Sequence, residues 1–190
     1  MLYEIRWHGR GGQGAITAAQ IIAEAAYYYH DKYITASPSF GAERRGAPIT
    51  ASTRISDENI RLRSPIINPD IVVVLDETLL RDVDVTAGLK KDGILIVNSP
   101  KQPRELNLKR NDIKVATADA TKVALDLNLR SAGLLVMNTP ILGAVVRATQ
   151  LGVSLDDILN TIKKHFPGTN GEINAEGAKR TYEITIFESE

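Results

Sequence analysis

The stretch LYEIRWHGRGGQGAITAA, residues 2–19, joins an alternating apolar and polar run to a glycine-rich turn and then to an alanine-rich segment. Residues 2–7 alternate as a strand does, and no Gly or Pro interrupts residues 15–28, which is typical of a helix. A strand, a glycine turn and a helix in this order predict the opening unit of an α/β fold. We expect one stripe of the helix to pack closely on a sheet, because alanines recur there at helical spacing: Ala15, Ala19, Ala23 and Ala26.

Apolar runs farther along the chain predict the other strands of this sheet. Continuous β-branched runs at residues 71–75 and 94–97 are typical of strands that are covered on both faces in a parallel sheet. Shorter runs at residues 32–37 and 113–116 fit two further strands. Between the two long runs we expect a helix that ends near residues 90–93, with Gly93 as its C-cap.

A different pattern interrupts the strand–helix alternation. Residues 48–56 and 60–63 both alternate between apolar and polar positions on either side of a short polar turn, which predicts a β-hairpin. From Thr121 onward the pattern is mainly helical. We therefore expect an α/β fold with a Rossmann-like, open, mostly parallel sheet flanked by helices, a β-hairpin excursion and a helical C-terminal part.

Two helix starts are predicted within the C-terminal part. Thr139 precedes Pro140, so the threonine is expected as the N-cap and the proline as the first helical residue. Ser154 and Asp157 have the spacing of an acidic capping box ahead of an apolar helical face. Both starts agree with a chain that becomes mainly helical after the sheet.

The composition limits the classes of function. A chain of 190 residues with 43% hydrophobic composition favours one domain, residues 1–190. Lys+Arg and Asp+Glu both number 23, so the net charge gives no support for binding nucleic acid or a membrane surface. The absence of cysteine excludes disulfides, thiolate metal sites and Cys-ligated iron–sulfur clusters in this polypeptide. With no signal-peptide pattern and no apolar run of about 20 residues, we expect a cytoplasmic protein.

The glycine-rich turn is the first candidate site. Its residues are Gly9, Arg10, Gly11, Gly12, Gln13 and Gly14. Glycines allow close backbone approach, and the N–H groups at a helix start attract an anion such as phosphate. A dinucleotide would also require an acidic residue about 20 residues farther on, and residues 36–39 contain none. The turn therefore predicts an anion site and argues against an autonomous dinucleotide-dependent oxidoreductase.

Two arginines stand near the position where that acidic residue would be. In a doubly wound fold, the loop that carries Arg44 and Arg45 would reach the same sheet edge as the glycine turn. With Arg10, the loop offers guanidinium groups to a phosphate-rich ligand or to an acidic partner. Alternatively, Glu43 pairs with one of the two arginines and braces the loop. The sequence leaves both interpretations open.

No nucleophile, catalytic base or metal-ligand set is identified, and no catalytic or metal-binding residue is assigned. His8 precedes the glycine turn and either faces a ligand or is a hydrogen-bonded histidine at a strand end, the second being favoured. Asp76, Asn98 and Ser99 follow the apolar strands and would lie at the carboxyl edge of the sheet. Their expected role is to cap the helices that follow.

Two stretches together resemble one family. These are RWHGRGGQGAITAAQIIAEAA (residues 6–26) and SPSFGAERRGAPITASTRIS (residues 37–56), and they are similar to the gamma subunit, or gamma domain, of the 2-oxoacid:ferredoxin oxidoreductases, most of all to the pyruvate type. The resemblance continues through NPDIVVVLDETLL (68–80), GILIVNS (93–99) and NTPILGAVVRATQ (138–150). It thus covers nearly the whole chain in order.

The resemblance implies a subunit of an enzyme that converts pyruvate, coenzyme A (CoA) and oxidised ferredoxin to acetyl-CoA, CO2 and reduced ferredoxin. The implied partners are alpha, beta and delta subunits, with ferredoxin as the electron acceptor of the complex. Thiamine diphosphate, magnesium and iron–sulfur clusters would reside in those partners, and none would be tightly bound here. CoA is the candidate ligand of the glycine turn with Arg44 and Arg45.

Three alternatives stay open within this interpretation. The complex could oxidise a branched-chain 2-oxoacid, 2-oxoisovalerate, in place of pyruvate. The chain could also be a purely structural scaffold, with the glycine turn and the arginines at a subunit interface. Whether the isolated chain forms a homodimer is also open. We expect no activity from the chain alone.

Overall fold

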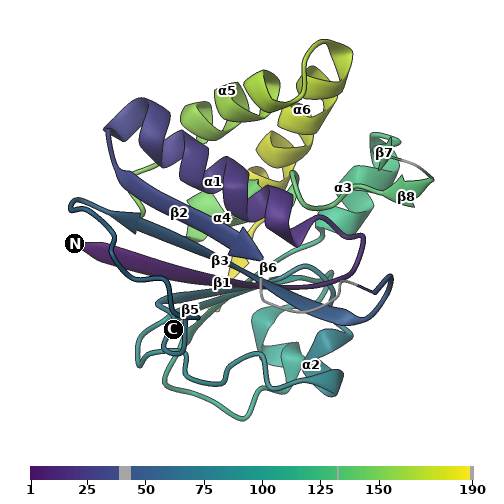
Figure 1. The fold of residues 1–190 in the computed structure, drawn as a ribbon. Helices are drawn as coiled ribbons and strands as arrows, with labels where there is room; N and C mark the ends of the chain where they lie inside the picture. Colours follow the sequence, from purple (N-terminus) through teal and green to yellow (C-terminus); the bar gives the residue numbers. More distant parts are fainter. Residues whose placement is uncertain (39–43, 132, 189–190) are drawn as a thin grey trace.

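The computed structural model describes residues 1–38, 44–131 and 133–188, and its centre is a seven-stranded mixed sheet (Figure 1). The strand order is β2-β3-β1-β4-β5-β6-β9. The strands are β1 (Leu2–Arg10), β2 (Tyr33–Pro38), β3 (Pro48–Ser56), β4 (Ile71–Val74), β5 (Ile94–Asn98), β6 (Lys114–Ala118) and β9 (Ile186–Phe187). Strands β1, β4, β5 and β6 are parallel, whereas β3 runs antiparallel to both β1 and β2, and β9 runs antiparallel to β6.

Helices cover both faces of this sheet. The helices are α1 (Ala15–His30), α2 (Leu79–Asp82), α3 (Ala120–Asp126), α4 (Ile141–Ala148), α5 (Leu155–His165) and α6 (Thr169–Glu183), with a 3-10 turn at Pro103–Leu106. Figure 1 shows α1, α4, α5 and α6 on one face and α2 on the other. No described helix is both long enough and apolar enough to cross a membrane. The predicted α/β fold with a mostly parallel sheet is confirmed.

The alanine stripe of α1 packs on the sheet as predicted. Its four alanines are all buried, and Ala15, Ala19 and Ala26 belong to the larger core cluster together with Trp7 of β1. The Trp7 indole N–H donates to Thr53 Oγ1 (3.0 Å), and the Thr53 hydroxyl donates to the carbonyl oxygen of Ala19 (2.9 Å). This buried chain joins β1, β3 and α1, and it satisfies polar groups that would otherwise be costly to bury.

The two β-branched runs are covered on both faces, as predicted. Along β4, Ile71 and Val73 belong to the core under α1 and α4, while Val72 and Val74 belong to a second core on the opposite face. Alternate side chains of a strand point to opposite faces of the sheet, so a strand that is covered on both faces has apolar side chains at successive positions.

The predicted hairpin is wrong in its pairing. Strand β3 pairs with β1 on one side, from Leu2↔Ser56 to Arg10↔Pro48, and with β2 on the other. Both edges of β3 are therefore occupied, and residues 60–63 form no strand. The antiparallel excursion exists, but its hairpin partners are β2 and β3.

The helix predicted to end near residues 90–93 is also wrong. Only the single turn α2 forms, and its C-cap Val83 is already extended. The Asp84 carboxylate accepts hydrogen bonds from the backbone N–H and the hydroxyl of Thr86, which favours a turn over a helix. Gly93 caps no helix, because its N–H donates to Lys90 within a tight turn that leads into β5.

Of the two predicted helix starts, one is confirmed. The Ser154 hydroxyl accepts from the N–H of Asp157 (3.2 Å), and the Asp157 carboxylate accepts from the N–H of Ser154 (2.8 Å). Thr139, in contrast, does not cap α4. Its hydroxyl donates to the side-chain oxygen of Asn174 on α6, and Pro140 takes the N-cap position. A tertiary hydrogen bond has replaced the local one.

Candidate functional site at the carboxyl edge of the sheet

The glycine turn, residues 9–14, lies at the carboxyl end of β1 and holds a second loop against itself. This second loop, the arginine loop (residues 44–47), forms a parallel bridge between Arg45 and Gly11. The N–H of Gly11 donates to Ala47 O (2.9 Å), and the N–H of Gly46 donates to Gly11 O (3.0 Å). A Cβ on residue 11 would overlap the carbonyl oxygen of Arg44. The structure thus brings together the two loops that the sequence singled out.

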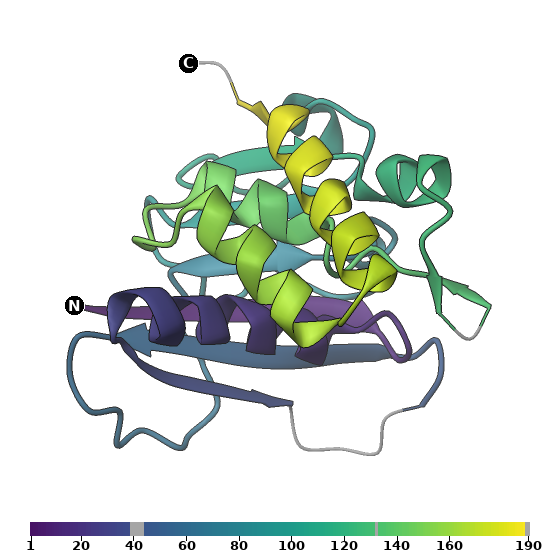
Figure 2. The same ribbon diagram turned by 90° about the horizontal axis from the view of Figure 1, so that it is seen from above.

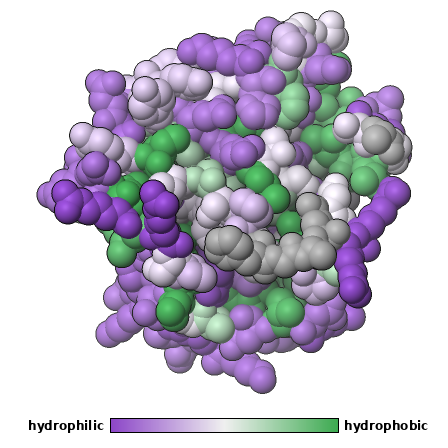
Figure 3. All heavy atoms as spheres, in the orientation of Figure 1, coloured by the Kyte–Doolittle hydropathy of each residue, from purple (hydrophilic) through white to green (hydrophobic). Residues whose placement is uncertain are grey.

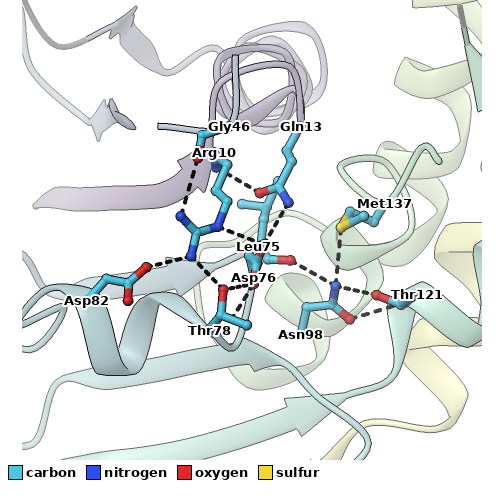
Figure 4. Close-up of polar contacts among 10 residues, drawn as sticks. All are labelled: Arg10, Gln13, Gly46, Leu75, Asp76, Thr78, Asp82, Asn98, Thr121 and Met137. Carbon is cyan, nitrogen blue, oxygen red and sulfur yellow. Dashed lines mark hydrogen bonds and ion pairs between the residues drawn. The ribbon is translucent and has the colours of Figure 1, made fainter. Parts of the chain in front are cut away.

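Arg10 is the hub of the polar network around these loops (Figure 4). Its Nε donates to Asp76 Oδ2 (3.2 Å), and its Nη2 donates to Asp82 Oδ2 and to Thr78 Oγ1 (2.6 Å each). Its Nη1 donates to the carbonyl oxygen of Gly46 in the arginine loop (3.3 Å). The hydrogen bond with Asp82 raises the pKa of Arg10. With two carboxylate partners, Arg10 fastens the loops together, so an incoming anion would rely on the other two arginines.

Gln13 and Asp76 complete the network. The side-chain oxygen of Gln13 accepts from the N–H of Arg10 (2.7 Å), and its side-chain nitrogen donates to Asp76 Oδ2 (2.9 Å). Burial alone would raise the pKa of Asp76, but hydrogen bonds from Thr78 and Gln13 outweigh it, and the pKa is lowered. Asp76 is therefore an ionised structural acceptor at neutral pH. It caps the turn at Thr78, through that residue's N–H, just before α2 begins.

Asn98 and Ser99, at the end of β5, also differ in role from the simple caps expected. The Asn98 amide nitrogen donates to Leu75 O and to Thr121 Oγ1 (2.9 Å each), and its oxygen accepts from the N–H of Thr121 (3.2 Å). The amide nitrogen also lies 3.4 Å from the sulfur of Met137 (Figure 4). Ser99 donates to Glu77. Asn98, at the end of β5, thus anchors the first turn of α3, the helix that follows the neighbouring strand β6.

Two cavities flank Gln13 at this edge. One, of about 480 Å³, is lined by the start of α1, by the hairpin of β7 (Arg130–Ser131) and β8 (Leu134–Leu135), and by side chains of the C-terminal helices. The other, of about 540 Å³, lies over the carboxyl ends of β4 and β5 and includes Asp76, Asn98 and Met137. Both volumes fall in the range of small-molecule sites.

Arg44 and Arg45 differ from Arg10 in having exposed side chains. Among the residues that the structure describes, neither side chain has an ion pair or a hydrogen bond. Glu43, the alternative partner expected for them, lies outside the described residues. Helix α1 follows its N-cap Gly14, which is in the left-handed conformation, and has no acidic residue in its first turn. This corner of the site combines exposed guanidinium groups with an uncompensated helix N-terminus.

His8 is buried, and it is a satisfied strand-end histidine as favoured. Its Nε2 accepts from Arg6 Nε (3.0 Å). Burial, reinforced by the charge of Arg6, lowers the pKa of His8 to about 4. The imidazole is therefore neutral at pH 7. Within the described ranges, no group of three or more His, Asp or Glu residues is placed to hold a metal ion.

The sequence did not predict that Thr78 and Asp82 belong to the network. Both lie in or beside the single turn of α2, where a longer helix was expected. The two residues face Arg10 only because that turn is placed at the end of β4. A local pattern carries no signal for such a placement.

Known proteins match this chain along nearly its whole length. A family model described as pyruvate ferredoxin/flavodoxin oxidoreductase matches residues 4–184. The chain is 53% identical over 190 residues to the "Pyruvate/ketoisovalerate oxidoreductases common subunit gamma" of Pyrococcus abyssi, covering 98% of this chain and 100% of that protein. It is 49% identical over 182 residues to the "Pyruvate synthase subunit PorC" of Methanothermobacter thermautotrophicus, covering 96% and 95%.

A solved structure shares both sequence and fold. The crystal structure of pyruvate oxidoreductase subunit PORC from Thermotoga maritima superposes with a TM-score of 0.84 at 42% sequence identity. The match covers 99% of each chain. The fold described above is thus seen in a relative from end to end.

We expect Gly11→Ala to loosen the arginine loop, because the added Cβ would overlap the Arg44 carbonyl oxygen. Trypsin cleavage after Arg44 and Arg45, followed by mass spectrometry, should become about ten-fold faster, which corresponds to a loss of about 1.4 kcal/mol of local stability. Gly9→Ala is the control, since a Cβ there meets only side-chain atoms, the nearest being that of Ala15 at 3.3 Å. Equal cleavage rates in both variants would contradict the assigned role of Gly11.

We expect His8 to make stability pH-dependent below neutrality. Its pKa falls from 6.5 to about 4 on folding, so the unfolded chain binds a proton in this range that the folded chain does not. The contribution of neutral His8 to the free energy of unfolding is fully present above about pH 6.5 and is lost as the pH falls to 4. It amounts to at most about 3 kcal/mol. His8→Gln keeps an acceptor for Arg6 and should flatten the difference in free energy of unfolding between pH 7.5 and pH 4.5. An unchanged pH dependence would show that His8 is not the cause.

Proposed function

The chain belongs to the pyruvate ferredoxin/flavodoxin oxidoreductase family, and from this we propose the part it takes in a reaction shared among subunits. It is a gamma subunit of a pyruvate/ketoisovalerate-type oxidoreductase complex, and so it is part of an enzyme. The reaction we assign to the complex converts pyruvate, CoA and oxidised ferredoxin to acetyl-CoA, CO2 and reduced ferredoxin. The observation that carries this proposal is the match of about half of all residues, over the full length, to subunits with these names.

The groups that perform the chemistry belong to partner subunits in this proposal. The chain has no cysteine, so it can supply no thiolate ligand to an iron–sulfur cluster. Arg10 and Asp76, at the carboxyl edge, are held in an ion pair with each other and, for Asp76, in a turn. We assign the clusters, thiamine diphosphate and magnesium to alpha, beta and delta subunits, with ferredoxin docking on the complex. The cytoplasmic location also remains a prediction.

The contribution of this chain would be to hold CoA by its phosphates. CoA carries a 3′-phosphate and a pyrophosphate, and guanidinium groups bind phosphates in a bidentate way. Arg44 and Arg45 are exposed, and the bridge to Gly11 fixes their backbone beside the start of α1. Arg10, saturated by Asp76 and Asp82, positions the arginine loop through Gly46. This arrangement offers donors to a polyanion without using a side chain that the fold itself needs.

A second role is supported by the same exposure. Arg45 or Arg44 could pair with a carboxylate of a partner subunit, which would make the edge an interface and the chain a scaffold. Charged groups in such a contact affect how well the subunits assemble, whereas groups that bind CoA affect the apparent affinity of the complex for CoA. The two roles therefore differ in which measurement the arginines affect.

The choice of 2-oxoacid is not expected to depend on this chain. CoA takes part whether the substrate is pyruvate or 2-oxoisovalerate, and the proposed site recognises phosphate rather than the acid. The Pyrococcus relative is named as a subunit common to pyruvate and ketoisovalerate oxidoreductases. We favour pyruvate because the subunits from Methanothermobacter and Thermotoga are named for pyruvate alone.

Coexpression with the neighbouring subunits tests the assignment. Pyruvate- and CoA-dependent reduction of ferredoxin or a viologen dye should require this chain. The same preparation with 2-oxoisovalerate as substrate measures the alternative. Activity that is unchanged when the chain is omitted would overturn its role as a functional subunit.

Arg44→Ala and Arg45→Ala test the CoA site in the assembled complex. Loss of one charge-assisted contact, about 1.5–3 kcal/mol, should raise the KM for CoA about ten-fold or more while the KM for pyruvate stays the same. Arg104→Ala, at another exposed arginine, should change neither. Weaker assembly with an unchanged KM for CoA would favour the scaffold role, and unchanged values throughout would reject both.

A further inference from the structure

A second surface with exposed basic and apolar side chains lies at the opposite, amino edge of the sheet. The connection from β3 to β4 leaves the sheet there, at the end away from the β7–β8 hairpin (Figure 2). We call residues 60–67 of this connection the amino-edge loop. Its Leu62 is 50% exposed and its Ile67 is 72% exposed, and Arg61 and Arg63 are also exposed. This is the segment expected to pair in a hairpin, and the fold leaves it without that partner.

A buried ion pair holds the loop in place. Arg54 of β3 is only 5% exposed, and its Nε donates to Glu4 Oε1 of β1 (2.8 Å). The same guanidinium donates to the carbonyl oxygens of Leu62 (3.4 Å) and Ser64 (2.7 Å). Removing the Glu4 carboxylate would leave the buried Arg54 guanidinium without a counter-charge, so the contact is strongly constrained. The backbone of the loop is therefore fixed to the sheet at its middle.

The far end of the loop is anchored as well. Ile66 is buried, and the next carbonyl oxygen, that of Ile67, lies where a Cβ on Gly88 would be. Gly88 has a φ of +72°, a conformation that other residues rarely adopt. The Pro69 carbonyl oxygen accepts from the N–H of Lys90 (3.1 Å). The backbone of the loop is held at its middle and at its far end, and in this fixed conformation the side chains of Leu62 and Ile67 are exposed.

The exposed side chains have the chemistry of an interface. The buried centre of a protein interface is more apolar than the rest of the surface, and arginine is enriched at interfaces. In the part of the chain that the structure describes, Arg61 and Arg63 have neither an ion pair nor a hydrogen bond. Figure 3 shows strongly hydrophilic side chains projecting on the left, the side on which the N-terminus lies in Figure 1, with apolar surface beside them. Two unpaired guanidinium groups are complementary to carboxylates on whatever covers them.

We propose that the amino-edge loop docks another subunit of the oxidoreductase, through a segment that presents Asp or Glu to Arg61 and Arg63 and apolar side chains to Leu62 and Ile67. The inference rests on the multi-subunit assembly stated under the proposed function. A second copy of this chain is a poorer occupant, because a two-fold axis at residues 60–67 would bring these arginines together and the loop itself contains no carboxylate. The docking surface lies at the other end of the sheet from the proposed CoA site, so the two can be tested separately.

Charge reversal tests the proposal in the coexpressed complex. Arg61→Glu with Arg63→Glu should lower the amount of this chain that copurifies with its partners about ten-fold or more, and added salt should no longer weaken the remaining association, because it then screens a repulsion between like charges. Arg104→Glu is the control at an exposed arginine elsewhere, and it reverses one charge where the double variant reverses two. The melting temperature of the isolated double variant should equal that of the unchanged chain, which separates lost docking from lost folding. Undiminished copurification of a folded double variant would overturn the proposal.

Cross-linking identifies the occupant. The chain has no cysteine, so Leu62→Cys introduces a single thiol that can carry a photoreactive cross-linker before the labelled chain is mixed with the other subunits. We expect a cross-link to another subunit close to its Asp or Glu residues, and none from Arg104→Cys. A cross-link only to a second copy of this chain, or none at position 62, would overturn the assignment. If the unchanged chain fails to join the complex at all, the proposed function fails, which is a separate result.

Discussion

The carbonyl oxygen of Arg44 occupies the place that a side chain on residue 11 would need. The arrangement of the two loops at the carboxyl edge of the sheet depends on this close contact. Only a glycine at position 11 lets the arginine loop exchange backbone hydrogen bonds with the glycine turn. That contact brings Gly46 within reach of the Arg10 guanidinium. A glycine pattern of the kind associated with phosphate binding here serves first to admit another part of the backbone. Any ligand function of the turn is built on that packing.

Two kinds of arginine in this chain have different physical roles. Arg10 and Arg54 each bind at least one carboxylate and one or more backbone carbonyl oxygens, so each holds a loop to the sheet. Their charges are compensated inside the fold, and a ligand would have to break existing ion pairs to use them. Exposed arginines that have no such partner among the described residues, such as Arg44 and Arg61, break no contact of the described fold when they bind something else. A count of basic residues, or a net charge near zero, cannot separate these groups, whereas the hydrogen bonds do.

Local patterns in the sequence were reliable where the local environment decides the structure. The alanine stripe of α1, the apolar runs of β4 and β5 and the capping box at Ser154 all formed as predicted, because each depends on burial or on contacts within one turn. The hairpin was wrong because alternation along residues 48–56 does not reveal which strand lies alongside, and β1, whose paired residues come 38 to 54 positions earlier, took that position. Thr139 likewise gave its hydroxyl to distant Asn174. The candidate site was predicted as far as its two loops, but Asp82 and Thr78 are placed by tertiary structure.

A rigid core joins the two edges of the sheet. Strands β1 and β3 run the whole distance, paired residue by residue from Leu2↔Ser56 at the amino edge to Arg10↔Pro48 at the carboxyl edge. The buried chain from Trp7 through Thr53 to Ala19 fixes α1 across their middle. A close-packed core of this kind resists gradual deformation, so it keeps the distance between the edges constant. If a partner subunit docks at the amino edge, this chain would therefore hold its arginine loop at a defined position relative to that partner. A ligand that must be placed beside the active centre of a neighbouring subunit requires such a fixed position.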